Sequence, residues 1–272
     1  MHYTFIYIFI LTVWMVAQPV TGQQLHPSIH VVLLGDSNTW LGGDDCSQDK
    51  GWNTWFNRRF QPASCRSYAR SGATWTNTNN TMYDVVEDIG VIGDNNVIYN
   101  QVNRLIVATK QGRQPLPDLL VIAAGTNDAW FENRRPHAFQ TTAADRLCDD
   151  SLLLLPPSQV LTLQQSIRYS CLQLHRAFPD ACIVLLTPLQ STAVSDEKIR
   201  LAGDLIERCA HELGIDVIRQ DVVCCIKSRQ ERKKKKYTYD GTHTSVSGAR
   251  LIGYLLADSI SKIIENRNLN HH

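Results

Sequence analysis

The chain of 272 residues lacks several features that mark common protein classes. Its formal net charge is only +1 at pH 7, so no overall field draws it to nucleic acid or to an anionic membrane. No Cys-x-x-Cys occurs, which removes the usual spacing of a zinc site or a thioredoxin-like motif. Internal repeats and low-complexity segments are absent too. With 43% hydrophobic residues, the chain can bury the core of one large α/β domain or of two small ones.

Long apolar runs are scarce as well, and the one exception stands near the start of the chain. Residues 5–17, FIYIFILTVWMVA, are continuously apolar and are followed by the polar QPVTGQQ. This run is too short for a comfortable membrane span but fits the apolar core of a signal peptide, with a cut near Gln23. We predict a signal peptide over residues 1–22 and a mature domain over 23–272, secreted or held in the periplasm or cell envelope. The leading MHYT has no Lys or Arg, so an uncleaved anchor is the alternative.

Eight cysteines in an exported chain raise the question of disulfides. Cys46 and Cys65 flank one predicted helix and could pair. Cys224 and Cys225 are adjacent, so a bridge between them would be strained. The sequence alone does not determine the connectivity.

Apolar, strand-like runs alternate with segments of helical spacing along the rest of the chain. The runs cover residues 29–35, 65–70, 117–125, 181–188 and 214–220. The helical segments cover residues 97–112, 160–178, 196–214 and 245–265, the last with Ser245 as a candidate N-cap. Continuously apolar strands are typical of a parallel sheet that is covered on both faces. We therefore predict a three-layer α/β/α fold with a doubly wound, five-stranded parallel sheet, and an insertion at 131–157.

Chemically capable residues follow the predicted strands, where ligands bind in a sheet of this kind. Ser37 comes after the first strand in GDSN, Gly72 after the second in RSGATW, and Asn127 after the third in AGTNDAW. Asp240 and His243 stand in YDGTHTS, before the closing helix. A serine, a histidine and a carboxylate are the parts of an acyl-transfer triad. Each motif alone is typical of an ordinary turn, but four of them at the carboxyl ends of strands favour a catalytic site.

These four motifs resemble a known superfamily. GDSN, the glycine of SGA, GTND and DGTH are similar to blocks I, II, III and V of the SGNH (GDSL-type) hydrolases, and the match spans essentially the whole mature chain. The resemblance implies a flavodoxin-like SGNH hydrolase fold and ester hydrolysis through an acyl-enzyme. It assigns the nucleophile to Ser37, the general base to His243 and the orienting carboxylate to Asp240. The oxyanion donors would be Ser37 N–H, Gly72 N–H and the Asn127 amide.

Two details of the motifs refine this interpretation. Asn38 stands where the family's motif has leucine, which leaves the serine intact and gives no help in choosing a substrate. The G-x-S-x-G elbow is absent, which argues against the separate α/β-hydrolase class of serine esterases. The chemistry needs neither a metal nor an organic cofactor.

Three tryptophans point to a substrate class. Each lies three residues beyond a predicted oxyanion contributor, and they are Trp40, Trp75 and Trp130. Flat indole faces are good platforms for sugar rings, although a bulky residue here could also simply pack a loop against the sheet. We therefore predict an exported esterase that removes small acyl groups, above all acetyl, from an acylated carbohydrate or another small ester. A lipase, lysophospholipase or thioesterase is the enzymatic alternative, and a catalytically silent glycan-binding module is the non-enzymatic one.

A run of basic residues, RQERKKKK, covers Arg229 to Lys236, just before Asp240. We interpret it as a solvated loop or a charge-rich edge, with attraction of an acidic, uronate-bearing glycan as the functional alternative. The run is too isolated to indicate nucleic-acid binding. No stable membrane insertion is expected once a signal peptide is removed, and the oligomeric state is not indicated.

Overall fold

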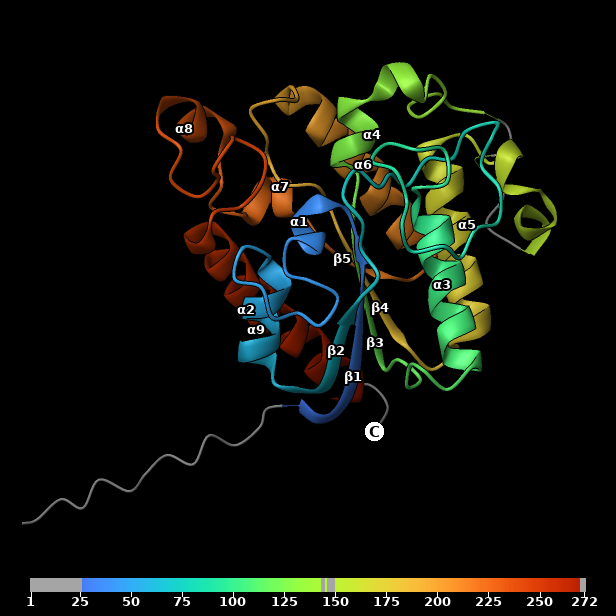
Figure 1. Cartoon of the computed structure of the whole chain (residues 1–272), viewed down its shortest axis with the longest axis horizontal. Helices are drawn as coiled ribbons and strands as arrows, with labels where there is room; N and C mark the ends of the chain where they lie inside the picture. Colours follow the sequence, from blue (N-terminus) through green and yellow to red (C-terminus); the bar gives the residue numbers. More distant parts are fainter. Residues whose placement is uncertain (1–25, 143–144, 146–149, 270–272) are drawn as a thin grey trace, which may run out of the picture.

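A five-stranded parallel sheet runs through the centre of the protein, with helices on both faces (Figure 1). Its strands are β1 (His26–Gly35), β2 (Pro62–Ser67), β3 (Leu119–Ala123), β4 (Cys182–Leu186) and β5 (Asp216–Ile218), in the spatial order β2-β1-β3-β4-β5. All neighbouring strands are parallel. The predicted doubly wound α/β/α fold is thus confirmed. The computed structural model describes residues 26–142, 145 and 150–269, so the signal peptide predicted over 1–22 lies outside the described residues.

The central strands are apolar on both faces, as the continuous runs in the sequence require. Val31 to Leu34 of β1 are fully buried, and so are Leu119 to Ile122 of β3. Edge strand β2, with the sequence PASCRS, is only partly buried. An edge strand gives a weaker apolar signal, and the prediction for β2 at 65–70 was displaced by three residues.

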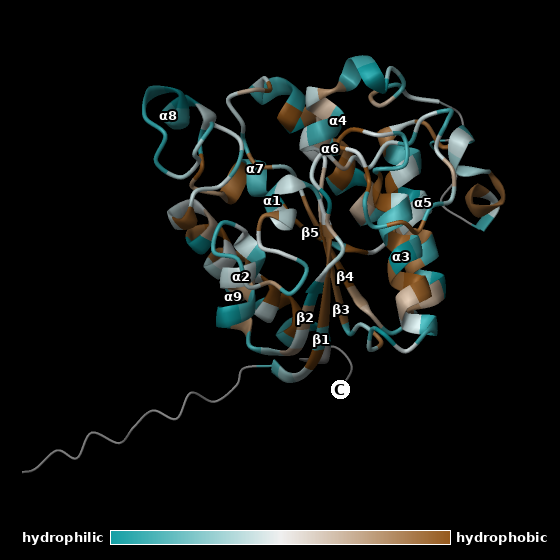
Figure 2. Cartoon of the chain, in the orientation of Figure 1, coloured by the Kyte–Doolittle hydropathy of each residue, from teal (hydrophilic) through white to brown (hydrophobic). Residues whose placement is uncertain are grey.

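Alternate side chains of the strands enter two separate cores, because successive residues of a strand point to opposite faces. Val32 and Leu34 of β1 pack under α3 (Ile98–Lys110), α5 (Leu163–Ala177) and α6 (Asp196–Glu212). Val31 and Leu33 pack on the other face, under α2 (Trp52–Phe60) and α9 (Val246–Leu269). Figure 2 shows the apolar residues gathered along the strands and on the inner sides of these helices.

The predicted helices end close to their expected bounds, since capping residues begin several of them. Thr162 and Gln165 form a reciprocal capping box at the start of α5. The Ser245 hydroxyl accepts a hydrogen bond from Gly248 N–H at 3.3 Å, which confirms it as a cap of α9. No helix in the described part of the chain is both long and apolar enough to cross a membrane.

Short helices and turns surround the carboxyl ends of the strands (Figure 1). The α-helices among them are α1 (Ser37–Trp40), α4 (Thr126–Trp130), α7 (Gln220–Val223) and α8 (Ser228–Lys233). Short 3-10 turns cover Glu132–Arg134, Asp150–Leu154 and Pro157–Gln159, within and beside the predicted insertion. The basic run is solvent-exposed at Lys233 to Lys236, as expected, but its first residues belong to α8 and not to a loop.

Two cysteines that could pair by sequence lie close together in space. The Sγ atoms of Cys46 and Cys65 are 3.2 Å apart, and both cysteines are free in this structure. Cys46 has a positive φ of 55°, a conformation that non-glycine residues rarely adopt, and Cys65 lies on β2. Their pairing stays a prediction, and it would join the segment between α1 and α2 to the edge of the sheet.

Candidate active site

Ser37 sits at the start of α1, immediately after the buried strand β1. The turn depends on Gly35, because a Cβ atom there would lie 2.5 Å from the carbonyl oxygen of Ala123 on β3. The Gln101 side chain from α3 bonds both the N–H and the carbonyl of Gly35, each at 2.8 Å. Asp36 then caps α1 by accepting from Asn38 N–H at 3.1 Å. The serine hydroxyl is therefore carried by a rigid turn, with the residue 8% exposed.

A hydrogen-bonded relay links this serine to a histidine and a carboxylate more than 200 residues later. Ser37 Oγ lies 2.9 Å from His243 Nε2, and His243 Nδ1 lies 2.6 Å from Asp240 Oδ2. Partial burial would raise the pKa of Asp240, but hydrogen bonds from the His243 ring and from backbone N–H groups hold it below its ordinary value. An ionised carboxylate can only accept, so Nδ1 donates to it and Nε2 is left to accept from the serine. The arrangement can remove a proton from Ser37 Oγ.

The other oxygen of Asp240 fixes the loop that connects Asp240 to His243. Asp240 Oδ1 accepts from Thr242 N–H at 2.9 Å and from His243 N–H at 2.8 Å. One carboxylate therefore orients both the backbone and the ring of the histidine. The spacing Asp-x-x-His makes this possible, because three residues are enough for a tight turn around the carboxylate.

The two further oxyanion candidates lie on neighbouring turns. Gly72 has a φ of +79°, and a Cβ atom there would lie 2.6 Å from a methyl group of Val91, so only glycine fits. Asn127 begins α4 together with Thr126 and donates its amide to Ala73 O at 2.9 Å. The amide NH₂ has a second hydrogen, which remains for a substrate oxygen. The described contacts thus bring the Gly72 turn and the Asn127 side chain together.

Asp128 is a buried residue whose role the sequence did not reveal. Its carboxylate accepts from Trp75 N–H at 3.1 Å, from Thr76 N–H at 2.9 Å and from the Thr76 hydroxyl at 2.5 Å. These bonds attach the segment after Gly72 to α4. The carboxylate therefore positions the loop and does not point at a substrate.

The three predicted tryptophan platforms divide into two groups. Trp40 is 45% exposed and Trp130 is 38% exposed, and the Trp130 ring stacks on Phe131 with a centroid distance of 5.3 Å. Trp75, in contrast, is completely buried in the core between the sheet, α3 and α5. The prediction was wrong for Trp75, because Asp128 holds its backbone so that the ring turns inward. For Trp40 and Trp130 the assignment stays a prediction.

Asn38, the departure from the family's motif, has a structural role that sequence reasoning missed. It is buried, donates its amide to Thr242 O at 3.3 Å and accepts from Thr244 N–H at 3.1 Å. These two partners flank His243. A leucine could make neither bond, so the only signal in the sequence was an amide where an apolar residue was expected.

Asp36 is a second missed residue. Burial raises its pKa to about 6, even though Asn38 N–H, the nearby His243 and the Thr126 hydroxyl all favour the ionised form. The carboxyl group lies next to the nucleophile in sequence and shares its surroundings with the base. The site therefore contains a buried group that titrates near neutral pH.

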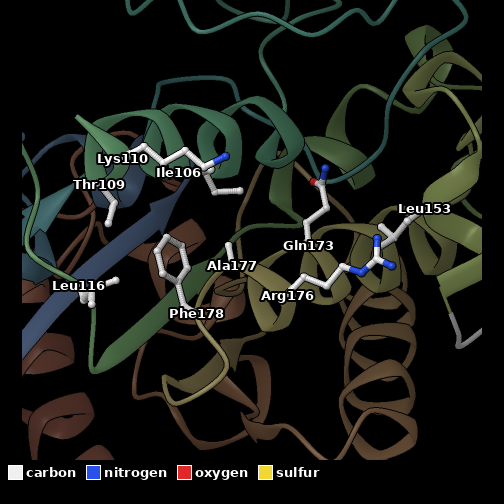
Figure 3. Close-up of a pocket in the computed structure, with 9 residues that line it drawn as sticks. All are labelled: Ile106, Thr109, Lys110, Leu116, Leu153, Gln173, Arg176, Ala177 and Phe178. Atoms are coloured by element: carbon white, nitrogen blue, oxygen red, sulfur yellow. The ribbon is translucent and has the colours of Figure 1, made fainter. Parts of the chain in front are cut away.

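Two cavities of about the same volume, 760 Å³ each, lie at opposite ends of the sheet. One lies beside α1 and the start of α9, lined by Trp40, Leu41, Gly43, Asp44, Gln48, Asp49, Lys50 and Val246. The other lies between α3 and α5, next to the amino ends of β3 and β4 (Figure 3). Within the described residues, no cluster of His, Cys, Asp and Glu has the spacing to hold a metal ion.

Comparison with known proteins identifies the family. The model of the GDSL-like Lipase/Acylhydrolase family matches residues 33–251, well over half of the chain and all four motifs. The chain belongs to this family. It is a GDSL-like serine ester hydrolase with the SGNH fold, as the resemblance implied.

Solved structures agree with this GDSL-like fold. A possible lipase from Chitinophaga pinensis DSM 2588 is 15% identical, with a TM-score of 0.57, and the alignment covers 87% of this chain and 99% of that one. A protein of Bacteroides uniformis ATCC 8492, named as a GDSL-like lipase, is 18% identical, with a TM-score of 0.55 and coverage of 86% and 96%. At such low identity these likenesses show the fold alone. None of the curated protein sequences matches the chain.

Proposed function

We propose that this GDSL-like hydrolase is a secreted esterase that uses Ser37 as its nucleophile and removes acetyl groups from a glycan. The observation that carries the proposal is the relay of 2.9 Å and 2.6 Å from Ser37 through His243 to Asp240. It has the atoms, the order and the hydrogen-bond distances that acyl transfer needs.

The mechanism follows from these contacts. His243 Nε2 takes the proton of Ser37 as the serine oxygen attacks the ester carbonyl carbon. The N–H groups of Ser37 and Gly72 and the amide of Asn127 would stabilise the oxyanion. The tetrahedral intermediate then loses the alcohol, which takes the proton from His243. Water enters, gives its proton to His243 and splits the acyl-enzyme into acetate and free serine.

The exposed indoles support a carbohydrate as the alcohol. Trp40 ends the short helix that Ser37 begins, and Trp130 ends the helix that carries Asn127. Both rings keep more than a third of their surface open. A sugar ring attached to the scissile ester could therefore lie against one of them.

A lipid ester is the second candidate, because one segment near the site is unusually apolar on its surface. Met82, Tyr83, Val86 and Val91 are each more than half exposed. Val91 also packs against Gly72, one of the oxyanion candidates. Such a surface could contact an acyl chain or a lipid aggregate.

A series of p-nitrophenyl esters separates the two candidates. A deacetylase should show turnover that falls from acetate to butyrate and is negligible at octanoate. A lipase should favour longer chains steeply, since each methylene that fits an apolar pocket gains about 0.8 kcal/mol. Activity that rises towards octanoate would contradict the deacetylase proposal and support the lipid ester.

Two variants test the sugar platform on the alcohol side. Trp40→Ala and Trp130→Ala should each lower kcat/KM for an acetylated xylo-oligosaccharide more than for p-nitrophenyl acetate, which makes no use of a platform. A loss of equal size on both substrates would mean that the indoles support the fold of the site and do not bind sugar.

Secretion is part of the proposal and rests on residues 1–22 alone. Expression of the full chain in a secreting host, followed by amino-terminal sequencing of the exported protein, should give a start near Gln23. An intact amino terminus in the membrane fraction would favour the uncleaved anchor.

A further inference from the structure

The cavity beside Ser37 contains one positive charge that is not neutralised by a neighbour. Its lining includes the carboxylates of Asp44 and Asp49 and the ammonium of Lys50. Each carboxylate pairs with an arginine, Asp44 with Arg70 at 2.9 Å and Asp49 with Arg58 at 2.8 Å, and Arg70 also contacts Glu87 at 3.6 Å. Lys50, in contrast, has no carboxylate within ion-pair distance among the described residues. Of the charged groups in this lining, Lys50 is therefore the one without an ion-pair partner in the described part of the chain, and its ammonium is free to bind an anionic ligand.

Lys50 lies next to the catalytic histidine through two contacts. Its carbonyl accepts a hydrogen bond from the Thr244 hydroxyl at 2.7 Å, one residue after His243. Its ammonium lies 5.9 Å from the centre of the Tyr239 ring, and that ring stacks on His243 with a centroid distance of 5.7 Å and an angle of 16°. A single aromatic ring therefore separates the charge from the base.

The cavity lies beside the segments that carry Ser37 and His243. His243 gives its proton to the leaving oxygen, so the alcohol part of the ester must be next to this histidine. The walls of the cavity come from Val246 and Lys50 near His243 and from Trp40 on the helix of Ser37. The sugar that carries the acetyl group would enter here, and its neighbours in the glycan would fill the remaining space.

More lysines lie near the start of α9, where Val246 lines the cavity. The Lys236 carbonyl accepts from the hydroxyls of Ser245 and Ser247 at 3.3 Å and 3.2 Å, which attaches the end of the basic run to the start of α9. Lys233 to Lys236 are all exposed. A polyanionic chain that leaves the cavity on this side would pass more lysines.

We infer that this cavity is a subsite for a carboxylate-bearing sugar, with Lys50 as the residue that recognises its charge and Trp40 as the platform for its ring. The inference rests on the proposed deacetylase function and adds a substrate class to it: acetylated glycans that contain uronic acids. The basic run is then an extension of the subsite that raises the local concentration of such chains.

The test compares two acetylated glycans that differ in charge. The mature protein, its Lys50→Gln and Lys50→Arg variants and a matched control, Lys110→Gln in the far cavity, are given acetylated polygalacturonate and acetylated xylan. The readout is the ratio of kcat/KM for the acidic glycan to that for the neutral one. We expect this ratio to fall about tenfold in Lys50→Gln, as the loss of a hydrogen bond to a charged group implies. It should recover in Lys50→Arg and stay unchanged in Lys110→Gln.

Salt provides a second readout on the same samples. The ratio for the wild type should fall as the ionic strength rises and the Debye length shrinks below about 10 Å. In Lys50→Gln the same dependence should be weaker. A ratio that is equal in the wild type and Lys50→Gln, with acetylated xylan hydrolysed normally, would overturn the inference and leave the deacetylase proposal intact. A wild type that hydrolyses neither acetylated glycan but still cleaves p-nitrophenyl esters would overturn the proposed function, and the inference with it.

Discussion

The two cavities described above have the same volume of about 760 Å³, yet they lie at opposite ends of the strands and have different lining residues. The far cavity is lined by apolar side chains such as Ile106, Leu116 and Phe178, with Lys110 and Arg176 at its edge (Figure 3). These residues come from the ends of α3 and α5 and from the loops that lead into the strands. The cavity beside α1 is lined by Trp40, on the helix that Ser37 begins, and by Val246, three residues after His243.

The difference follows from the direction of the strands. At their carboxyl ends, the chain must turn sharply into helices, and these turns expose backbone N–H groups and short polar side chains towards one point. In this hydrolase, the end of the strands at which a cavity lies therefore indicates whether reactive side chains are near it, whereas the volume of the cavity does not.

The largest expected effect is at the nucleophile. Ser37→Ala should reduce turnover of p-nitrophenyl acetate by at least about 10³-fold, because removal of a triad member normally costs several orders of magnitude. The far-cavity variants Leu116→Ala and Arg176→Gln should keep wild-type turnover, since both side chains are exposed and far from the site. If Ser37→Ala kept more than about a hundredth of the activity, the assignment of the nucleophile would fail. A large loss of turnover in the far-cavity variants would show that the amino ends of the strands matter for activity as well.

The next effect concerns charge that forms only in the transition state. Asn127→Ala should lower kcat by about 10²–10³-fold with little change in KM, because the amide would act on the oxyanion and not on the ground-state ester. Steady-state kinetics over a full range of substrate concentration separates the two parameters. A raised KM with unchanged kcat would make Asn127 a substrate-binding residue instead.

A third effect concerns the stability of the catalytic end. Asp36 holds its proton more tightly in the folded than in the unfolded chain, since burial raises its pKa to about 6. Its contribution to stability is therefore complete below about pH 4 and is lost as the pH rises through about 6. Each pKa unit corresponds to about 1.4 kcal/mol, so ionisation of Asp36 lowers the free energy of unfolding by up to about 3 kcal/mol at pH 7.

Asp36→Asn removes this cost and keeps the capping oxygen of α1. We expect the free energy of unfolding of the variant to rise relative to the wild type by up to about 3 kcal/mol between pH 4 and pH 7. Urea unfolding at a series of pH values measures it, with Asp88→Asn at an exposed carboxylate as the control. A difference that stays constant with pH would show that burial of Asp36 carries no such penalty.

The smallest expected effect concerns a disulfide in the segment that lines the cavity beside α1. Cys46 lies in the segment that supplies Gly43, Asp44 and Gln48 to the lining, and we expect it to form a disulfide with Cys65 in protein exported to an oxidising compartment. Peptide mapping under non-reducing conditions should find the linked pair. Cys65→Ser should then lower the stability of oxidised protein by about 2 kcal/mol, with Cys182→Ser as the control. Free thiols at both positions in the exported protein would refute the pairing.

The sequence predicted the sheet and the polar motifs because both depend on local patterns. Short, continuously apolar runs that alternate with helical segments are typical of strands covered on both faces, and the polar turns after such strands meet at one edge of a parallel sheet. The orientation of Trp75 was not predictable, since the partner that turns it inward, Asp128, lies 53 residues later in the chain. The role of Asn38 was hidden for the same reason, because its partners Thr242 and Thr244 are about 200 residues away.

The bonds between Asn38 and the loop of His243 have a consequence for the synthesis of the protein. All five strands are complete at Ile218, whereas Asp240, His243 and the helix α9 that covers one face of the sheet come later in the chain. Without Asp240 and His243, however, the serine has no base, and Asn38 has no partners for its buried amide. With Ser37 as the proposed nucleophile, the relay can form only when the segment of Asp240 and His243 docks against the turn after β1.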